Sequence, residues 1–575
     1  MCNCLFSRVR DAALLVACLF ALGNFAVARF PAPIRAPTVP RLISKIRDPH
    51  PWIPVGKETT RVTAPVGDDG YIDYLAAMNA AASEGVTAEN NAAVLLLRAI
   101  DLSSIPASER DRLCKTLGIK PSQGSAGLFQ ESASFLTNQG DRFGETISSM
   151  APWSPTDFAP RAKWLKNHEQ ALDLAIEATL RPRFYIPLIR PPVTGSEPGE
   201  LWDVPLYGLQ ATNEIARALA ARALLRIHDG NIAAAEHDFL ACHRLARLVA
   251  GGPFLLHGAV GRAIEIKTCL AEAALLQYGK LSAADALAYR AQLQKLPPLP
   301  SVAHHLGHGD RMLILGFATE LAQKQQPKLE DMVLSIAPFA NPEFLTDLLT
   351  DQMTIIWSEG MRSLNKEWDR WVAVAATPLL SGRLQQLEKL EQEVRPLLKE
   401  TPEAYSNAPL VERGRWMGRM LADRLMPAFK QDLLIEDRVR MRLELVQLGF
   451  ALAAYKADTG TFPPTLKALA PKYCLEAELP ADRFTAKPLL YRPQAEGYVL
   501  SSTGENGKDD GGRNSESQPP GDDIVIQVVV KQQIEDSLGA SKGWLQFAGL
   551  LLGAAALGGM TFFGIWLTTK RSSPS

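Results

Sequence analysis

The stretch 437-DRVRMRLELVQLGFALAAYKADTGTFP-463 decides the fold of the C-terminal part of the chain. Its apolar residues recur at intervals of three and four, which predicts a helix that ends near Lys456. Residues two apart lie about 200° apart around a helix, so the apolar residues form two distinct stripes. One stripe is expected to pack on a sheet, and the other needs the upstream helices or a partner protein as its cover. The stripes are Val439, Leu443, Val446, Phe450 and Ala454, and Met441, Leu445, Leu448, Leu452 and Tyr455.

Short strand-like runs follow this helix, at residues 488–492, 497–502 and 523–530. A polar, glycine-containing loop separates the last two runs. Together with the helix, these runs predict a small α+β unit over residues 437–530.

The order of these elements resembles the head domain of the type II secretion pseudopilins, above all the major pseudopilin. The resemblance rests on Gly460, Phe462 and Pro463 after the tyrosine-lysine end of the helix, and on the glycine-rich acidic loop before the last strand. It implies a long helix with a small antiparallel sheet packed on it. The family starts with a prepilin-peptidase site, and Met1 opens no such motif here. The resemblance therefore implies a pilin-like head used as a module, and not a fibre subunit that assembles in the usual way.

Four carboxylates in the polar loop are a candidate calcium site: Asp509, Asp510, Asp522 and Asp523. Calcium takes about six to eight oxygen ligands from carboxylates, carbonyls and water, which a flexible loop can supply. In the major pseudopilin the corresponding loop binds calcium. A solvated acidic turn is the alternative, because Asp and Gly also favour turns.

The C-terminal run 544–569 is predicted to be a transmembrane helix. It carries no charge, has Trp544 and Trp566 near its ends, and runs into Lys570 and Arg571. Its length exceeds the roughly 20 residues that a bilayer requires. The basic residues place the tail in the cytoplasm and the bulk of the chain on the other side of the membrane. Within the run, two small residues four apart suggest a homodimer contact: Gly549 and Gly553.

A second apolar run lies at residues 12–28, after Arg8 and Arg10. It has the features of a secretory signal peptide that is cleaved after Ala28. An uncleaved anchor gives the same topology, and residues 15–18 also resemble a bacterial lipobox. These three alternatives stay open.

The region between the two runs predicts a mostly helical ectodomain. A helix is expected at residues 88–100 with Thr87 as its N-cap. A helical hairpin is expected at residues 209–250, with its turn at Asp229-Gly230 and Asn231 as the second cap. This hairpin is similar to a tetratricopeptide-type helix pair. A third helix at 255–278 follows, and Ser282 with Asp285 starts a fourth.

The sequence therefore predicts a mainly α protein: an irregular helical domain, a small α+β pilin-like module and a C-terminal transmembrane helix. Its expected divisions are a signal peptide or anchor (1–28), a proline-rich extended spacer (29–66), an α-helical domain (67–300), a second helical region (301–430), the α+β module (437–530), the membrane span (544–569) and a cytoplasmic tail (570–575).

Other candidate sites carry weaker signals. His304 and His308 stand four apart and could share a metal, but no matching ligand is evident. His168 lacks the second histidine of a zincin motif. Of the seven cysteines, Cys242 and Cys269 are the one pair worth testing for a disulfide, whereas buried thiols are the more common state of such scattered cysteines. Their disulfide state, and that of Cys114 and Cys474, is left open.

These features predict a non-catalytic scaffold or interaction protein of the bacterial cell envelope, with an envelope protein as its partner and a link to type II secretion or pilus-like machinery. The net charge of −1 gives no electrostatic argument for nucleic acid. Two alternatives remain: a helical-repeat module around residues 209–294 that binds a peptide, and an envelope hydrolase whose site is formed by distant residues.

Overall fold

The computed structural model confirms a mainly helical protein with a small three-stranded antiparallel sheet near its C-terminus. The predicted segment 1–28, the span 544–569 and the tail, with Gly549 and Gly553, lie outside the described residues. Within the part that is described, none of the helices combines the length and apolarity needed to cross a membrane. The structure describes residues 53–103, 105–120, 128–129, 151–190, 201, 204–323, 356–378, 380–394, 408–424, 429–514, 517 and 519–529.

In the described part of the chain, five helices precede the centre of the molecule. They are α2 (Tyr74–Ser83), α3 (Ala92–Ala99), α4 (Ala107–Leu117), α7 (Ala159–Asn167) and α8 (Glu169–Ala178). The helix predicted at 88–100 with Thr87 as its cap was placed too early. It starts at Ala92, because the side chain of Asn91 accepts from the backbone N–H of Ala93 at 3.1 Å. Thr87 instead exchanges hydrogen bonds with Asn90 in the turn before the helix.

Two helical hairpins build the centre of the molecule: α9 (Leu209–His228) with α10 (Ile232–Ala250), and α11 (Leu255–Tyr278) with α12 (Ala283–Gln294). The predicted caps are confirmed. Asn231 accepts from the N–H of Ala234 at 3.4 Å, and Ser282 accepts from that of Asp285 at 3.1 Å. These caps satisfy backbone donors that each helix start leaves free.

A second group of helices surrounds its own apolar core. It comprises α13 (Val302–Gly307), α14 (Gly309–Gln323), α17 (Trp357–Ala376), α18 (Leu380–Val394) and α20 (Leu410–Arg424). Helices α17 and α20 approach at Gly360, Gly414 and Gly418, where added Cβ atoms would meet backbone atoms of the opposite helix. The end of the proline-rich stretch packs on this group, since Asn365 of α17 donates to the carbonyl of Thr59 at 2.8 Å.

The C-terminal part consists of α21 (Phe429–Thr459), the 3₁₀ turns η4 (Leu466–Leu469) and η5 (Glu476–Glu478), and the strands β1 (Leu490–Pro493), β2 (Tyr498–Ser502) and β3 (Ile524–Val528). The strands pair in the order β1-β2-β3. The helix begins at Phe429, ahead of the start predicted at Asp437, and continues to Thr459.

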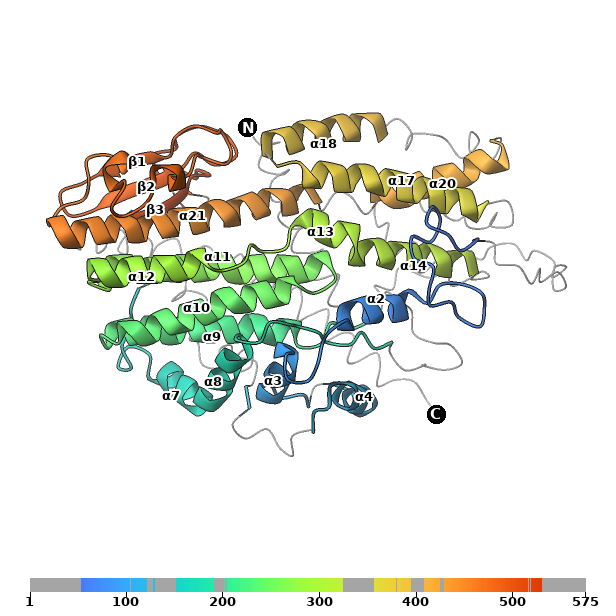
Figure 1. Cartoon of the computed structure of the whole chain (residues 1–575), viewed down its shortest axis with the longest axis horizontal. Helices are drawn as coiled ribbons and strands as arrows, with labels where there is room; N and C mark the ends of the chain where they lie inside the picture. The colour runs from blue at the N-terminus through green and yellow to red at the C-terminus, as the bar shows by residue number, and fades with distance from the viewer. Residues whose placement is uncertain are drawn as a thin grey trace.

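Helix α21 is covered on two sides (Figure 1). The sheet lies on one side of it, and α11 with α12 lies on the other, followed by α10 and α9. Phe450 of the first predicted stripe packs edge-on against Tyr289 of α12, with ring centroids 4.9 Å apart. Tyr455 of the second stripe contacts Tyr473, which follows η4. One apolar core therefore continues from the helices into the sheet, and the upstream helices supply the cover that α21 requires.

Candidate functional site

The acidic loop connects two paired strands. Ser502 of β2 lies opposite Ile524 of β3, so the two ends of the loop are held side by side. Gly504 adopts a φ of +64°, and a Cβ there would collide with the backbone oxygen of Asp522. Only glycine fits this close approach, which folds the loop back on itself.

Three of the four predicted calcium ligands meet in this loop. Carboxylate oxygens of Asp510, Asp522 and Asp523 lie within 4.8 Å of one another. The carboxylate of Asp523 accepts from the N–H of Gly512 at 2.8 Å, and that of Asp510 accepts from the N–H of Asp522 at 3.1 Å. Asn506 donates its backbone N–H to Asp522 at 2.8 Å. Backbone hydrogen bonds thus hold the carboxylates together.

The electrostatics of this group favour a cation. Burial raises the pKa of Asp523, and neighbouring carboxylates add to the effect against the hydrogen bond from Gly512. One oxygen of Asp522, Oδ1, is buried and has no hydrogen-bond partner. A divalent cation would supply a partner for that oxygen and offset the repulsion among the carboxylates.

The fourth predicted ligand, Asp509, is engaged elsewhere. Its carboxylate forms an ion pair with Arg492 of β1 and accepts from the N–H of Gly511 at 2.8 Å. The hydrogen bond from Arg492 lowers the pKa of Asp509. The loop also contacts α21, since Glu505 lies 2.7 Å from Arg438.

The histidine candidates have structural contacts. The rings of His304 and His308 lie 4.6 Å apart, and Nδ1 of His308 contacts the carbonyl of His304 at 2.8 Å. No third ligand joins them within the described part of the chain. His168 contacts the carbonyl of Trp164 through Nδ1 at 2.8 Å and packs against its ring.

The four cysteines in the described part of the chain are buried free thiols, so a Cys242–Cys269 disulfide is absent from the structure. Cys242 instead donates to the carbonyl of Ala216 at 3.4 Å. Cys269 lies beside His243 and Glu265, a group that the sequence interpretation missed. The sequence feature that could have revealed this group is the presence of polar side chains on helix faces that are otherwise apolar.

A cavity of about 480 Å³ opens between the start of α2 and the end of α14. Asp68, Asp69, Asp73, Arg190 and Glu320 line it, but none of its described lining residues is a His, Cys or Ser. Glu320 is already paired with Arg190 at 3.1 Å. The cavity therefore offers carboxylates and Thr319, and lacks the histidine of a triad among its described lining residues.

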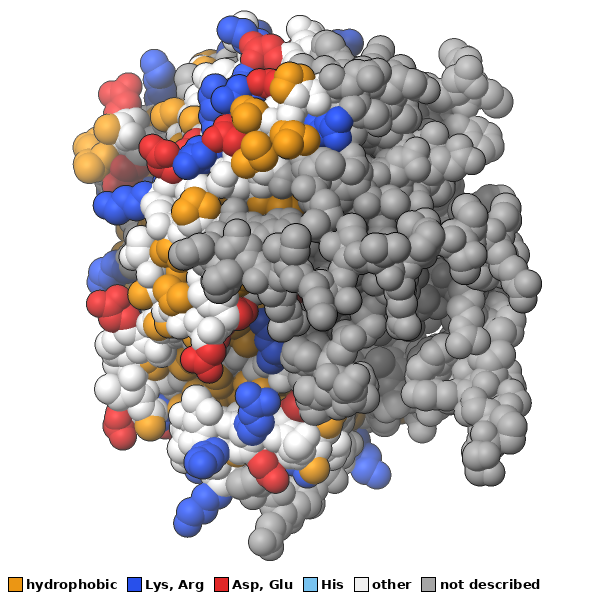
Figure 2. All heavy atoms as spheres, turned by 90° about the vertical axis from the view of Figure 1, so that its right-hand side faces the viewer, with side chains coloured by type: hydrophobic (Ala, Val, Ile, Leu, Met, Phe, Trp, Pro, Cys, Tyr) orange, Lys and Arg blue, Asp and Glu red, His pale blue; other side chains and the backbone are white. Residues whose placement is uncertain are grey.

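Charge is mixed among the described side chains on one face of the molecule. On the face shown in Figure 2, the described acidic and basic side chains are interspersed, in keeping with the net charge of −1.

Comparison of the chain with protein-family models, curated proteins and solved structures finds no match.

Proposed function

We propose that this chain is a non-catalytic, membrane-anchored scaffold of the bacterial cell envelope. It presents a pseudopilin-like head outside the cytoplasm, and the head's acidic loop binds calcium. The supporting features are the helix, hairpin and loop in pilin-like order, and the apolar run at residues 544–569. An envelope protein, such as a component of type II secretion or a pilus-like machine, is the expected partner.

The observation that carries this proposal is the position of α21 between the sheet and the helical body. Gln277 of α11 pairs with the backbone of Val529 through two hydrogen bonds of 2.8 Å, next to β3. At the other end of α21, a carboxylate oxygen of Asp432 lies 2.9 Å from a guanidinium nitrogen of Arg262. A carboxylate oxygen of Asp437 lies at the same distance, 2.9 Å, from a guanidinium nitrogen of Arg383. A helix held in this way is not free to enter a fibre core, which favours a fixed platform over a fibre subunit.

The two alternatives have less support. A peptide-binding groove needs exposed apolar side chains, and Tyr278 is the only large hydrophobic residue exposed between residues 209 and 294, all of which are described. A hydrolase built on a catalytic triad needs a histidine beside its serine or cysteine nucleophile. The cavity beside α14 offers mainly carboxylates, one of which is paired with Arg190.

Calcium titration of the purified full chain tests the loop. Calcium should raise the melting temperature relative to chelator, since a ligand that binds only the folded state stabilises it. Asp522→Asn should weaken calcium binding about tenfold or more by removing ligand charge. Asp509→Asn is the matched control, because Asp509 faces Arg492, and it should change the affinity by less than about twofold. Equal melting curves with calcium and chelator would refute calcium binding.

Topology and partner need separate tests. An alkaline phosphatase fused after residue 530 should be active in a bacterial host, and one fused after residue 575 should be inactive. Crosslinking in native membranes should then capture a specific envelope protein. An inactive phosphatase at residue 530 would place the head in the cytoplasm and overturn the proposal.

A further inference from the structure

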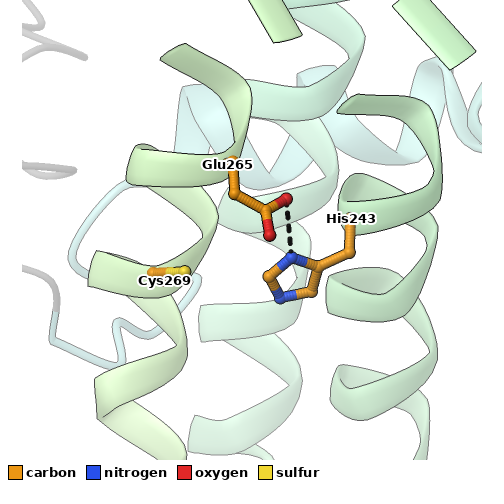
Figure 3. A group of neighbouring side chains, drawn as sticks. All are labelled: His243, Glu265 and Cys269. Atoms are coloured by element: carbon orange, nitrogen blue, oxygen red, sulfur yellow. Dashed lines mark ion pairs between the residues drawn. The ribbon is translucent and has the colours of Figure 1, made fainter. Parts of the chain in front are cut away.

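A second group of potential ligands lies in the centre of the helical body, far from solvent. His243 comes from α10, and Glu265 and Cys269 come from α11. His243 and Glu265 have no exposed surface, and Cys269 has 1%. In Figure 3, the side chains of Glu265 and Cys269 extend toward the imidazole of His243 on the facing helix. Two residues four apart on one helix thus share a face with one residue of its neighbour.

The three side chains place nitrogen, oxygen and sulfur atoms within 4.8 Å of one another. Nδ1 of His243 lies 2.9 Å from a carboxylate oxygen of Glu265, as the dashed line in Figure 3 marks. That contact meets the distance of an ion pair but not the geometry of a hydrogen bond, so buried Nδ1 has no hydrogen-bond partner. A buried ring nitrogen of this kind calls for a partner in the plane of the ring.

The opposite ring nitrogen is fixed by other residues. Nε2 of His243 lies 3.2 Å from a carboxylate oxygen of Glu272, about two turns after Glu265 along α11. The hydroxyl of Tyr289 donates to the other oxygen of Glu272. A carboxylate that accepts from the Nε2–H of a histidine fixes the orientation of the ring and turns Nδ1 toward the metal position, which is the usual outer arrangement at histidine ligands.

We propose that Nδ1 of His243, the carboxylate of Glu265 and the sulfur of Cys269 provide three of the ligands of a structural zinc site between α10 and α11. Nitrogen, oxygen and thiolate ligands are those that Zn²⁺ takes in proteins. Ligands about 2.0–2.3 Å from one ion lie about 3.3–3.8 Å apart in a tetrahedron. Spacings of up to 4.8 Å need only small side-chain movements to reach this range.

The charges of the cluster fit one divalent ion. Arg247 lies 2.9 Å from Glu265 and balances one carboxylate, and an imidazolium at His243 would balance Glu272. On binding, Zn²⁺ replaces the Nδ1 proton of His243 and the thiol proton of Cys269. Two protons leave as two positive charges arrive, so the buried cluster stays neutral. Each oxygen of Glu265 has a second lone pair, so Arg247 and the ion can both contact it.

The burial of the site gives it a role in folding. With no exposed surface on two of its ligands, the site takes up its ion as the chain folds, and the ion then joins α10 to α11. This inference is independent of the proposed function, because the calcium loop lies in the β2–β3 connection.

Metal analysis of the purified full chain tests the proposal. About one equivalent of zinc should remain after gel filtration, and Cys269→Ser should retain less than a tenth of it. Cys242→Ser is the matched control, a buried thiol of the same core that is not among the ligands, and it should retain the full equivalent. Refolding with Co²⁺ should give a thiolate-to-cobalt charge-transfer band in the wild type and in the control, but not in Cys269→Ser.

A milder variant covers the case in which Cys269→Ser does not fold. Glu272→Gln keeps all three ligands and weakens only the support of His243, so zinc affinity should fall about 10–100-fold. A folded wild-type chain that neither retains zinc nor binds Co²⁺ on refolding would overturn the proposal and leave a metal-free buried ion cluster. Equal zinc content in Cys269→Ser and the wild type would also overturn it.

Discussion

Gly418 of α20 lies directly against Gly360 of α17. A Cβ atom at position 418 would collide with the carbonyl oxygen of Gly360 and lie 2.7 Å from the backbone nitrogen of Leu364. Both of these are backbone atoms, which cannot move aside as a flexible side chain can. The two helices therefore cross at backbone contact, and glycine is the only residue that permits it there.

Gly418→Ala should destabilise the chain by about 1–3 kcal/mol, because overpacking outweighs the better helix propensity of alanine. The change should appear as a lower midpoint of urea unfolding. Gly307→Ala is the control, since its Cβ would lie 3.8 Å from a methyl group of Val372 and meet no backbone. Equal losses in the two variants would show that the crossing is not responsible.

The glycine crossing illustrates which features the sequence does not reveal. Local signals predicted the hairpin caps at Asn231 and Ser282, because each cap depends on residues within three positions. The two apolar stripes of α21 likewise predicted a helix that is covered on two sides. Gly414 and Gly418 stand four apart, as Gly549 and Gly553 do. Whether such a pair forms a helix contact depends on the partner helix, and the sequence does not identify that partner.

The candidate sites show the same division. Asp510, Asp522 and Asp523 lie in one loop between adjacent strands, so their proximity was predictable from the local sequence. Asp509 was assigned with them, but its partner Arg492 comes from β1, and only the strand register reveals that pair. His243 and Glu265 lie on two different helices and meet only in the folded chain. Polar residues of a helix usually mark its solvent-exposed face, so the sequence did not indicate this pair.

Arg383 of α18 should prove essential for the position of α21. Its side chain is 1% exposed, and a guanidinium nitrogen lies 2.9 Å from the buried carboxylate of Asp437. Arg383→Ala leaves that carboxylate poorly compensated, with Arg483 at 3.6 Å and Arg440 as its remaining cationic neighbours, and should cost about 3 kcal/mol. Unfolding by urea measures the loss.

A double variant separates the charge from the packing. Arg383→Met with Asp437→Leu removes both charges and keeps most of the apolar volume, so it should recover much of the stability lost in Arg383→Ala. If the double variant were as unstable as Arg383→Ala, lost packing and not an uncompensated charge would explain the effect.

The four described cysteines should be unreactive in the folded chain. Cys114, Cys242, Cys269 and Cys474 are all buried and free, and burial raises the pKa of each thiol. Because the thiolate is the nucleophile, iodoacetamide should label none of them before unfolding and all of them in urea without reductant. Peptide mass spectrometry reads each site separately. A Cys242–Cys269 disulfide peptide would contradict the structure.

Asp310 at the start of α14 should make stability depend on pH. Its carboxylate accepts from the N–H of Leu255 at 2.8 Å, and burial raises its pKa from 3.8 to about 8, with Asp432 adding to the rise. The folded chain thus holds this proton more tightly than the unfolded chain does. Its contribution to the free energy of unfolding is complete below about pH 4 and is lost as the pH rises to about 8.

Asp310→Asn tests this directly, because the amide oxygen can still accept from Leu255 but carries no charge at any pH. The wild type should lose stability relative to Asp310→Asn between pH 5 and pH 8, by at most about 1.4 kcal/mol per pH unit. Urea unfolding of both proteins at each pH gives the difference. Below pH 4 the difference should become constant, since both forms are then neutral. Parallel curves from pH 5 to pH 8 would mean that Asp310 is ionised in the folded chain, with Arg262 and not a proton as its counterpart.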